Sequence, residues 1–292
     1  MSSKAKSLLA MICVVVILAS MICIPASAVK DEPDGDGETL VLAYTEIPMF
    51  LNGNYLGVGY ILDSVTYVPM LAFCEAMLLT DFEASWDQET SSVALRTEDL
   101  DISMKLSDNY IVANGRYFYI AEGAYNINGT VIAPIRELAR IFNVSVDWDE
   151  DKRILDIDTS DLEILQSGDE FYNEDDLYWL SHVIFSESGA EPLEGMIGVG
   201  NVVLNRVADD SGAFEDTIED VIFQPGQFSV AETGAVYLDP NEESVVAAKL
   251  CLEGYNTVDD SKFFLNPEIS SSKWFKKYKT YVTSIADHDF YA

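Results

Sequence analysis

One carboxyl side chain lies where it could carry out acid–base chemistry. Glu187 follows an apolar helical pattern whose members, Leu177, Leu180 and Ile184, recur at spacings of three and four. A carboxyl at such a helix end, between apolar elements, can be partly desolvated, which raises its pKa and suits it to act as a general acid. A solvated glutamate at a helix end is the alternative interpretation, and Glu187 taken alone does not exclude it.

Other catalytic chemistries have weaker support in the sequence. The chain has two histidines, His182 and His288, which are too isolated to form a zinc cluster, so no metal and no cofactor is expected. Serine catalysis has no Gly-x-Ser-x-Gly elbow, although a pairing of Ser229 with His288 stays open. Cys251 lies inside an apolar helical pattern, as Cys74 does, and both are predicted to be buried free thiols without a disulfide.

The segment that must position Glu187 reads as several helices. Asn173 is a predicted N-cap for the helix that ends near Glu187, and Pro192 is predicted to open the next. Thr217 is a predicted cap further on, and Asp239-Pro240 is predicted to open a helix that stops before Gly254. Residues 173–292 are therefore predicted to form a mainly-α domain.

The preceding segment, residues 45–159, contains one pattern twice. Each copy has strands, a Pro before an amphipathic helix, and a hairpin with a Trp-Asp pair. The pairs are Trp86-Asp87 and Trp148-Asp149, and the helices follow Pro69 and Pro134. The sequence thus predicts a multidomain chain in which an α+β duplicated N-terminal module precedes the mainly-α domain. Residues 160–172, polar and acidic, are predicted to be the linker.

The start of the chain has the features of a secretory signal peptide. Residues 1–28 contain two lysines, an apolar run and the small residues Ala26-Ser27-Ala28 before a predicted cleavage site. An uncleaved membrane anchor is the alternative, because the apolar run approaches the length of a membrane span. Residues 29–44 are predicted to be an acidic leader. We therefore expect a secreted, extracellular or wall-associated protein.

The charge of the chain limits its partners. Acidic residues number 50 against 17 basic ones, a formal net charge of −33. Nucleic acids and anionic membranes are polyanions, so neither is an expected partner once the signal peptide has been removed. An acidic secreted chain with aromatic loops is compatible with a sugar polymer as substrate.

The duplicated module resembles the copper amine oxidase N-terminal domain family. The resemblance lies in the Val68-Pro69 and Trp86-Asp87 pairs and in the second copy, Ala133-Pro134-Ile135-Arg136-Glu137 with Asp147-Trp148-Asp149. It implies an accessory module with no copper site, able to contact the wall or a protein. Trp86 and Trp148 could stack on sugars, although aromatic residues on strands more often lie in cores.

Residues 178–291 resemble the SleB/CwlJ-type cell wall hydrolases, the spore-cortex-lytic enzymes and their relatives. The matching motifs are Phe185-Ser186-Glu187 with Glu191, then Asn205-Arg206-Val207, Gly226-Gln227-Phe228-Ser229, Asn266-Pro267 and His288-x-Phe290-Tyr291. Ser188-Gly189-Ala190 replaces the usual Ala-Arg-Gly of the family. The loss of that arginine bears on substrate affinity or local electrostatics but leaves Glu187 in place.

This resemblance implies a lysozyme-like, transglycosylase-like domain that cleaves the MurNAc–GlcNAc β-1,4 bond of peptidoglycan. Glu187 would act as general acid and base in lytic transglycosylation. Gln227, Ser229, Tyr291 and His288 would bind substrate. Asn205 and Arg206 would anchor a helix behind the site.

Three alternatives remain open at the level of sequence. Hydrolysis needs a second carboxylate, for which Glu191 and Glu194 are the candidates, although both also suit the first turn of a helix. An N-acetylmuramoyl-L-alanine amidase and a non-catalytic cell-wall-binding protein are the other two. Spore cortex and vegetative wall are not distinguished.

Overall fold

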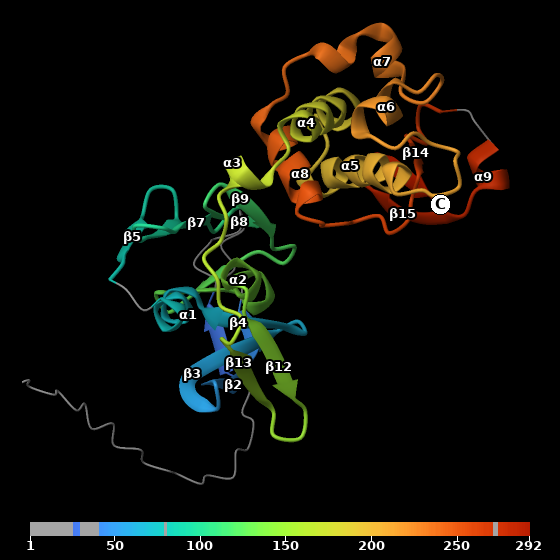
Figure 1. The fold of residues 1–292 in the computed structure, drawn as a ribbon. Coiled ribbons are helices and arrows are strands. Elements are labelled where there is room, and N and C mark those ends of the chain that lie inside the picture. Colours follow the sequence, from blue (N-terminus) through green and yellow to red (C-terminus); the bar gives the residue numbers. More distant parts are fainter. Residues whose placement is uncertain (1–25, 30–40, 79–80, 271–273) are drawn as a thin grey trace, which may run out of the picture.

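The computed structural model describes residues 26–29, 41–78, 81–270 and 274–292 (Figure 1). Most of the predicted signal peptide and acidic leader lies outside these ranges. Ala26–Val29 forms strand β1, which pairs with β2, Val41–Leu51. The predicted acidic leader, residues 29–44, therefore overlaps the first residues of β2, which begins at Val41. We call residues 41–158 the front module and residues 173–292 the C-terminal domain.

The front module contains two sheets. The larger sheet has eight strands in the order β10-β11-β4-β3-β2-β13-β12, with β1 added on β2, and β13 runs parallel to β2. Its remaining strands are β3 Asn54–Leu62, β4 Val65–Pro69, β10 Tyr125–Ile127, β11 Thr130–Pro134, β12 Ser145–Asp149 and β13 Ile154–Asp158. The smaller sheet consists of β5 Glu83–Asp87, β6 Ser92–Arg96, β7 Asp101–Lys105, β8 Tyr110–Ala113 and β9 Arg116–Tyr119.

The two copies of the repeat exchange their hairpins. The first copy's Trp hairpin, β5–β6, joins β7, β8 and β9, whereas the second copy's hairpin, β12–β13, joins β2 and β3. Strands β4 and β11, one from each copy, pair antiparallel between Val68 and Ala133. The predicted duplication is thus present, but the Trp hairpin of each copy adds to the sheet of the other copy.

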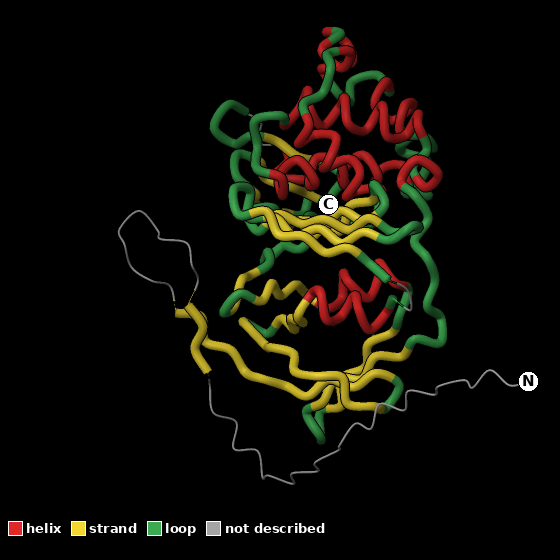
Figure 2. Tube along the Cα trace, turned by 90° about the vertical axis from the view of Figure 1, so that its left-hand side faces the viewer, coloured by secondary structure: helices red, strands yellow, loops and turns green. Residues whose placement is uncertain are grey.

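Two short helices lie between the sheets. They are α1, Met70–Met77, and α2, Ile135–Phe142, and each begins directly after a proline, as predicted. Figure 2 shows this helix layer with strands above and below it. The main core is an apolar cluster that includes Phe73, Phe118 and Phe142, and a smaller buried cluster surrounds Tyr67. Burial of apolar side chains from both copies therefore holds the module together.

The C-terminal domain is mainly helical, which confirms the predicted order of domains. Its helices are α4 Glu174–Ser188, α5 Leu193–Val207, α6 Ile218–Phe223, α7 Ser229–Thr233, the 3₁₀ turn η1 Ala235–Tyr237, α8 Glu242–Leu252 and α9 Trp274–Tyr278. Within the described ranges, no helix is both long enough and apolar enough to cross a membrane.

The caps of these helices are partly as predicted. Asn173 and Thr217 accept hydrogen bonds from the backbone N–H groups of Asp176 and Asp220. The prediction for Asp239-Pro240 was wrong by two residues, because Asn241 is the cap and accepts a hydrogen bond from the N–H of Ser244. Pro192 likewise precedes the first turn of α5 instead of opening it.

A three-stranded sheet closes this domain and was not predicted. Its order is β14-β16-β15, and its strands are β14 Phe263–Leu265, β15 Tyr281–Ile285 and β16 His288–Tyr291. Phe290 is fully buried against Val202 and Val258, so β16 is packed against α5.

The predicted linker is packed against the front module. Leu162 and Leu165 lie against the core of the front module, and residues 168–171 form the short helix α3, Gly168–Phe171. Gly168 must be a glycine, because a Cβ there would lie 2.5 Å from the carbonyl oxygen of Gly115. The segment is therefore an ordered part of the front module and does not extend freely between the two parts.

An ion-pair cluster fastens the two parts together. Arg116, on β9, forms two hydrogen bonds of 2.8 and 2.7 Å with the carboxylate of Glu253, at the end of α8. The Tyr172 hydroxyl donates to the same carboxylate at 2.9 Å, and Arg140 donates to the Glu253 carbonyl oxygen. The Glu253 side chain is 1% exposed, so these contacts are shielded from water.

Candidate active site

Glu187 lies one residue before the end of α4, as the apolar pattern predicted. The last turns of this helix are fixed to η1 by two side chains. His182 Nδ1 lies 3.0 Å from the carbonyl oxygen of Val236, and the Ser186 hydroxyl donates to the carbonyl oxygen of Ala235 at 3.0 Å. His182 is therefore a buried core histidine with a backbone partner.

Gly189, the residue after α4, lies where the family motif has an arginine, and it is closely packed in this chain. A Cβ at Gly189 would lie 2.6 Å from the carbonyl oxygen of Phe185 and 2.7 Å from its ring. The Asn241 side chain also donates to the Gly189 carbonyl oxygen at 3.2 Å. Any residue with a Cβ at position 189 would therefore require the turn after Glu187 to shift.

The environment of Glu187 favours its protonated form. The side chain is half-buried, and no side chain among the described residues donates a hydrogen bond to its carboxylate. Burial raises the pKa of Glu187 above the ordinary glutamate value, while the positive charge of Arg206 opposes this rise. Because desolvation is the larger effect, the carboxyl holds its proton more firmly than a solvated glutamate.

Arg206 is the cation that acts on Glu187, and it lies on the last turn of α5. Its Nε donates to the carbonyl oxygen of Lys262 at 2.8 Å, while its buried Nη1 has no hydrogen-bond partner among the described residues. The guanidinium lies over three aromatic rings, those of Phe214, Phe228 and Phe263, at 5.1, 4.8 and 5.5 Å from their centroids. Burial lowers the pKa of Arg206 to about 10, so it stays charged at neutral pH.

Arg206 is the residue whose electrostatic effect the sequence interpretation missed. Asn205 does anchor the helix as expected, since its amide donates to the carbonyl oxygens of Asp259 and Ser261. Arg206 was expected to anchor the helix in the same way. In the structure its charge also opposes the rise in the pKa of Glu187, and its guanidinium lies among three aromatic rings. The available signal was a single arginine ending an otherwise apolar helix in a chain with few basic residues.

Gln227 and Ser229 lie on either side of Phe228, one of the rings beneath Arg206. Gln227 is half-buried, and its backbone N–H closes a turn onto Gln224. Ser229 is exposed at the start of α7. Among the described residues neither side chain forms a hydrogen bond with Glu187, so their place in substrate binding stays a prediction.

The two candidates for a second carboxylate are directed elsewhere. Glu191 faces the C-terminal hairpin, where its Oε1 lies 3.9 Å from His288 Nδ1 and its Oε2 accepts a hydrogen bond from the N–H of Asp287. Glu194 is exposed, and its negative charge adds to the effect of burial, the larger cause, in raising the pKa of Tyr119 in the front module. Neither carboxylate is hydrogen-bonded with Glu187.

The remaining predicted residues lie in β16. Tyr291 is 1% exposed, pairs with Phe263 in the sheet, and donates a hydrogen bond to Asp289. His288 is buried with its ring edge-on to Phe264, and it forms no hydrogen bond with Ser229. The structure therefore does not assemble the serine–histidine pair that the sequence left open.

The two cysteines and the acidic residues do not offer a metal site. Cys74 and Cys251 are buried free thiols, as predicted. Burial raises the pKa of Cys74 to about 12, which disfavours the reactive thiolate. Within the described ranges, no group of three or more histidine, cysteine, aspartate or glutamate side chains could hold a metal ion.

Comparison with known proteins assigns families to both parts of the chain. Residues 190–291 match the family described as Cell Wall Hydrolase, and residues 50–157 match the family described as Copper amine oxidase N-terminal domain. Both matches agree with the resemblances drawn from the sequence. The first match begins just after Glu187.

The similar curated proteins are spore cortex-lytic enzymes. The protein from Bacillus cereus is 33% identical over 103 residues, which cover 35% of this chain and 39% of that protein. The protein from Oceanobacillus iheyensis is 30% identical over 103 residues, covering 35% of this chain and 37% of its own length. The chain thus spans about two fifths of the length of the curated relatives it matches.

One solved structure that matches is the catalytic domain of the germination-specific lytic transglycosylase SleB from Bacillus anthracis. It is 30% identical, with a TM-score of 0.39, and the match covers 44% of this chain and 100% of that one. Through its C-terminal domain, the chain therefore belongs to the cell wall hydrolase family, and it carries a copper amine oxidase N-terminal-like domain in front.

Proposed function

We propose that this chain cleaves the glycan strands of peptidoglycan at the MurNAc–GlcNAc β-1,4 bond. Glu187 would be the general acid and base of a lytic transglycosylation. The observation that carries the proposal is the partly buried Glu187 carboxyl, whose pKa is raised at the end of α4, next to a domain of the cell wall hydrolase family. A raised pKa keeps such a group protonated, which is the state that a leaving-group acid requires.

The proposed reaction needs one carboxyl group from the protein. The protonated Glu187 donates its proton to the glycosidic oxygen as the bond to C1 of the muramyl sugar breaks. The carboxylate then takes the proton of the C6 hydroxyl of that sugar, and O6 bonds to C1. The products are a 1,6-anhydromuramyl end and a free C4 hydroxyl, with no water consumed.

The position of Arg206 supports this cycle. The carboxylate formed after proton donation is half-buried and has no hydrogen bond from the described side chains. The charge of Arg206 favours this carboxylate and prevents its pKa from rising further. Burial and the cation thus act in opposite directions, and the group can serve in both protonation states.

The surroundings of Glu191 and Glu194 favour transglycosylation over hydrolysis. Hydrolysis requires a second carboxylate beside the scissile bond to attack it or activate water. Glu191 is held by His288 and Asp287, and Glu194 lies exposed towards the front module. Neither is therefore our choice for a second catalytic group.

The test is the analysis of products from purified peptidoglycan by mass spectrometry. We expect anhydromuramyl ends from the wild-type chain and a loss of rate on the order of 10²–10⁴-fold in Glu187→Gln. Glu194→Gln is the matched control and should keep its activity. Reducing ends would indicate hydrolysis, freed stem peptides would indicate an amidase, and no product from cortex or vegetative wall would refute catalysis.

The location of the protein follows from the same proposal. Its substrate lies outside the cytoplasmic membrane, so we propose that the chain is exported to the wall or the spore cortex. The relatives named spore cortex-lytic enzymes support this location. Detection of the protein in the wall fraction of producing cells would test it.

A further inference from the structure

We propose that the front module binds an uncharged chain of N-acetylated sugars in a groove around Trp86. The identification of the sugar chain as the glycan backbone of peptidoglycan rests on the proposed function. The groove itself is a separate site in a separate domain. The argument begins with the duplication of the module, which yields two equivalent pockets.

Each pocket combines three pieces of the repeat: the start of a helix, the Trp hairpin of the same copy, and a turn from the other copy. The first copy supplies Pro69, Leu71, Ala72 and Trp86, with Asn126 to Val131 from the second. The second copy supplies Pro134, Arg136, Glu137 and Trp148, with Ser64 to Thr66 from the first. The pockets are therefore related by the internal symmetry that exchanges the hairpins.

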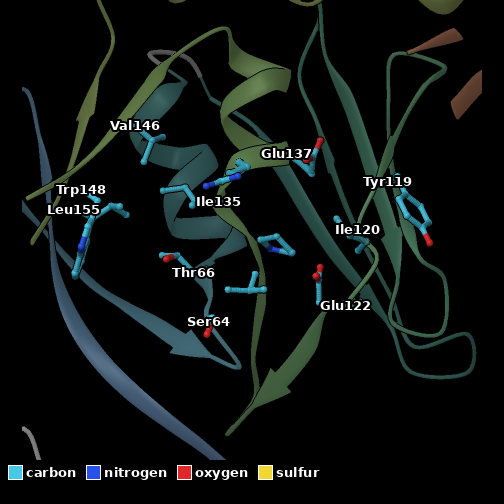
Figure 3. Close-up of a pocket in the computed structure, with 13 residues that line it drawn as sticks. Ser64, Thr66, Tyr119, Ile120, Glu122, Ile135, Glu137, Val146, Trp148 and Leu155 are labelled. Atoms are coloured by element: carbon cyan, nitrogen blue, oxygen red, sulfur yellow. The ribbon is translucent and has the colours of Figure 1, made fainter. Parts of the chain in front are cut away.

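One edge of the Trp148 pocket takes part in the contact with the C-terminal domain. Figure 3 shows Trp148 and Leu155 on one side of this pocket of about 380 Å³, with Glu137 and Tyr119 towards the other side. The Tyr255 hydroxyl donates a hydrogen bond to Glu137, and the Tyr255 ring packs edge-on against Tyr119 at 5.9 Å. Tyr255 belongs to the C-terminal domain, so one edge of this pocket is part of the domain contact.

The pocket of Trp86, which we call the Trp86 groove, is open and about 650 Å³ in volume. Its lining residues all belong to residues 69–131, and Figure 1 shows α1 and β5 on the side of the front module that faces away from the C-terminal helices. The Trp86 ring is 40% exposed, and its Nε1 donates to Gln88 at 3.3 Å, which fixes the ring orientation.

The lining of the groove selects for a neutral ligand. None of its twelve lining residues is charged, in a chain of net charge −33. At the positions where the Trp148 pocket has Arg136 and Glu137, this groove has Leu71 and Ala72. An anionic ligand would meet the repulsive field of the whole chain, and a cationic ligand would find no carboxylate in the groove.

Its polar groups match those of a sugar. Ser85, Gln88, Asn126 and Thr130 surround the exposed indole with hydroxyl and amide groups. Such groups exchange hydrogen bonds with hydroxyl and N-acetyl substituents, while the flat face of a pyranose ring covers the aromatic surface. An exposed tryptophan in an uncharged groove is thereby explained by a polysaccharide, the polymer on which the C-terminal domain is proposed to act.

The experiment is a calorimetric titration of the full chain with the tetramer of β-1,4-linked N-acetylglucosamine. We expect Trp86→Ala to weaken binding on the order of tenfold, with Trp86→Phe less affected because it keeps a flat ring. Tyr55→Ala is the matched control, because Tyr55 is an aromatic residue of the same module, 64% exposed and outside the groove. Thermal unfolding of each variant confirms that the fold is intact.

The outcomes separate this proposal from the proposed activity. Unchanged binding in Trp86→Ala, or no binding by the wild-type chain, would overturn the groove even if peptidoglycan is cleaved. Binding that depends on Trp86 in a chain that cleaves nothing would uphold the groove and refute the enzyme.

Discussion

A single carboxyl group on α4 combines two opposing influences in this chain. Desolvation raises the pKa of Glu187, and Arg206 acts against that rise from the last turn of α5. The raised pKa already includes the attraction of Arg206, so the ionised carboxylate destabilises the folded state relative to its protonated form. The proposed activity is thus accompanied by a cost in stability.

This cost can be measured with Glu187→Gln, which imitates the protonated group. We expect the variant to unfold at a higher temperature than the wild-type chain at pH 7. The gain should disappear below the ordinary glutamate pKa of 4.5, because there the wild-type carboxyl is protonated in both states. Thermal unfolding at pH 4 and pH 7 checks this, and an equal difference at both values would contradict it.

At the scale of elements, the turn after α4 determines where Glu187 lies. Gly189 is packed against Phe185, and Asn241 holds its carbonyl oxygen. Contacts of η1 with His182 and Ser186 hold the same helix end from the other side. The orientation of the proposed catalytic carboxyl therefore depends on residues that never touch substrate.

Gly189→Ala tests this dependence. The added Cβ would lie 2.6 Å from the Phe185 carbonyl oxygen, so the turn must shift. We expect a loss of about 1–3 kcal/mol in the free energy of unfolding and a reduced rate on peptidoglycan. Gly57→Ala is the control, since its nearest contact is a Met49 methyl at 3.9 Å. An equal effect of the two changes on activity would show that the turn does not matter.

Local sequence patterns predicted the elements better than their arrangement. Apolar spacing located α4 and α5, and the cap residues Asn173 and Thr217 marked helix starts, because these signals act within one turn. The exchange of hairpins between the two copies was not predictable, since pairing of β13 with β2 is a long-range contact. The strands β14 to β16 were missed because each is short, and β14 and β16 are rich in aromatic residues that also suit loops.

The candidate site was predicted to a similar extent. Glu187 was identified by its place at a helix end, a local feature. The influence of Arg206 depends on how α5 crosses towards α4 and on three rings from distant segments. No spacing in the sequence contains that information.

At the scale of the whole molecule, Glu253 joins the two domains. Its buried carboxylate is shared by Arg116 and Tyr172, and the guanidinium of Arg116 lies 3.5 Å from the ring centroid of Phe171 in the packed linker. A buried ion pair contributes little net stability, but removing one partner leaves the other charge unpaired. The relative position of the domains is therefore sensitive to this one residue.

Glu253→Gln should separate the unfolding of the two domains. Loss of the carboxylate leaves Arg116 buried without a counter-charge, at a cost of about 3–5 kcal/mol. We expect two transitions in calorimetry and faster proteolysis within residues 160–172. Asp101→Asn removes an exposed pair with Arg96, whose side chain is 68% exposed, and should change neither. A single unaltered transition in Glu253→Gln would refute the proposed importance of this contact.

The exchanged hairpins also imply that the two copies of the front module fold only together. Strand β13 of the second copy completes the sheet of the first, and β6 of the first completes the sheet of the second. A fragment containing one copy would expose open sheet edges and half a core, so it should aggregate instead of folding. During synthesis, about a hundred residues follow β2 before its parallel partner β13 is made. This long-range pairing favours slow folding, after the whole module has left the ribosome.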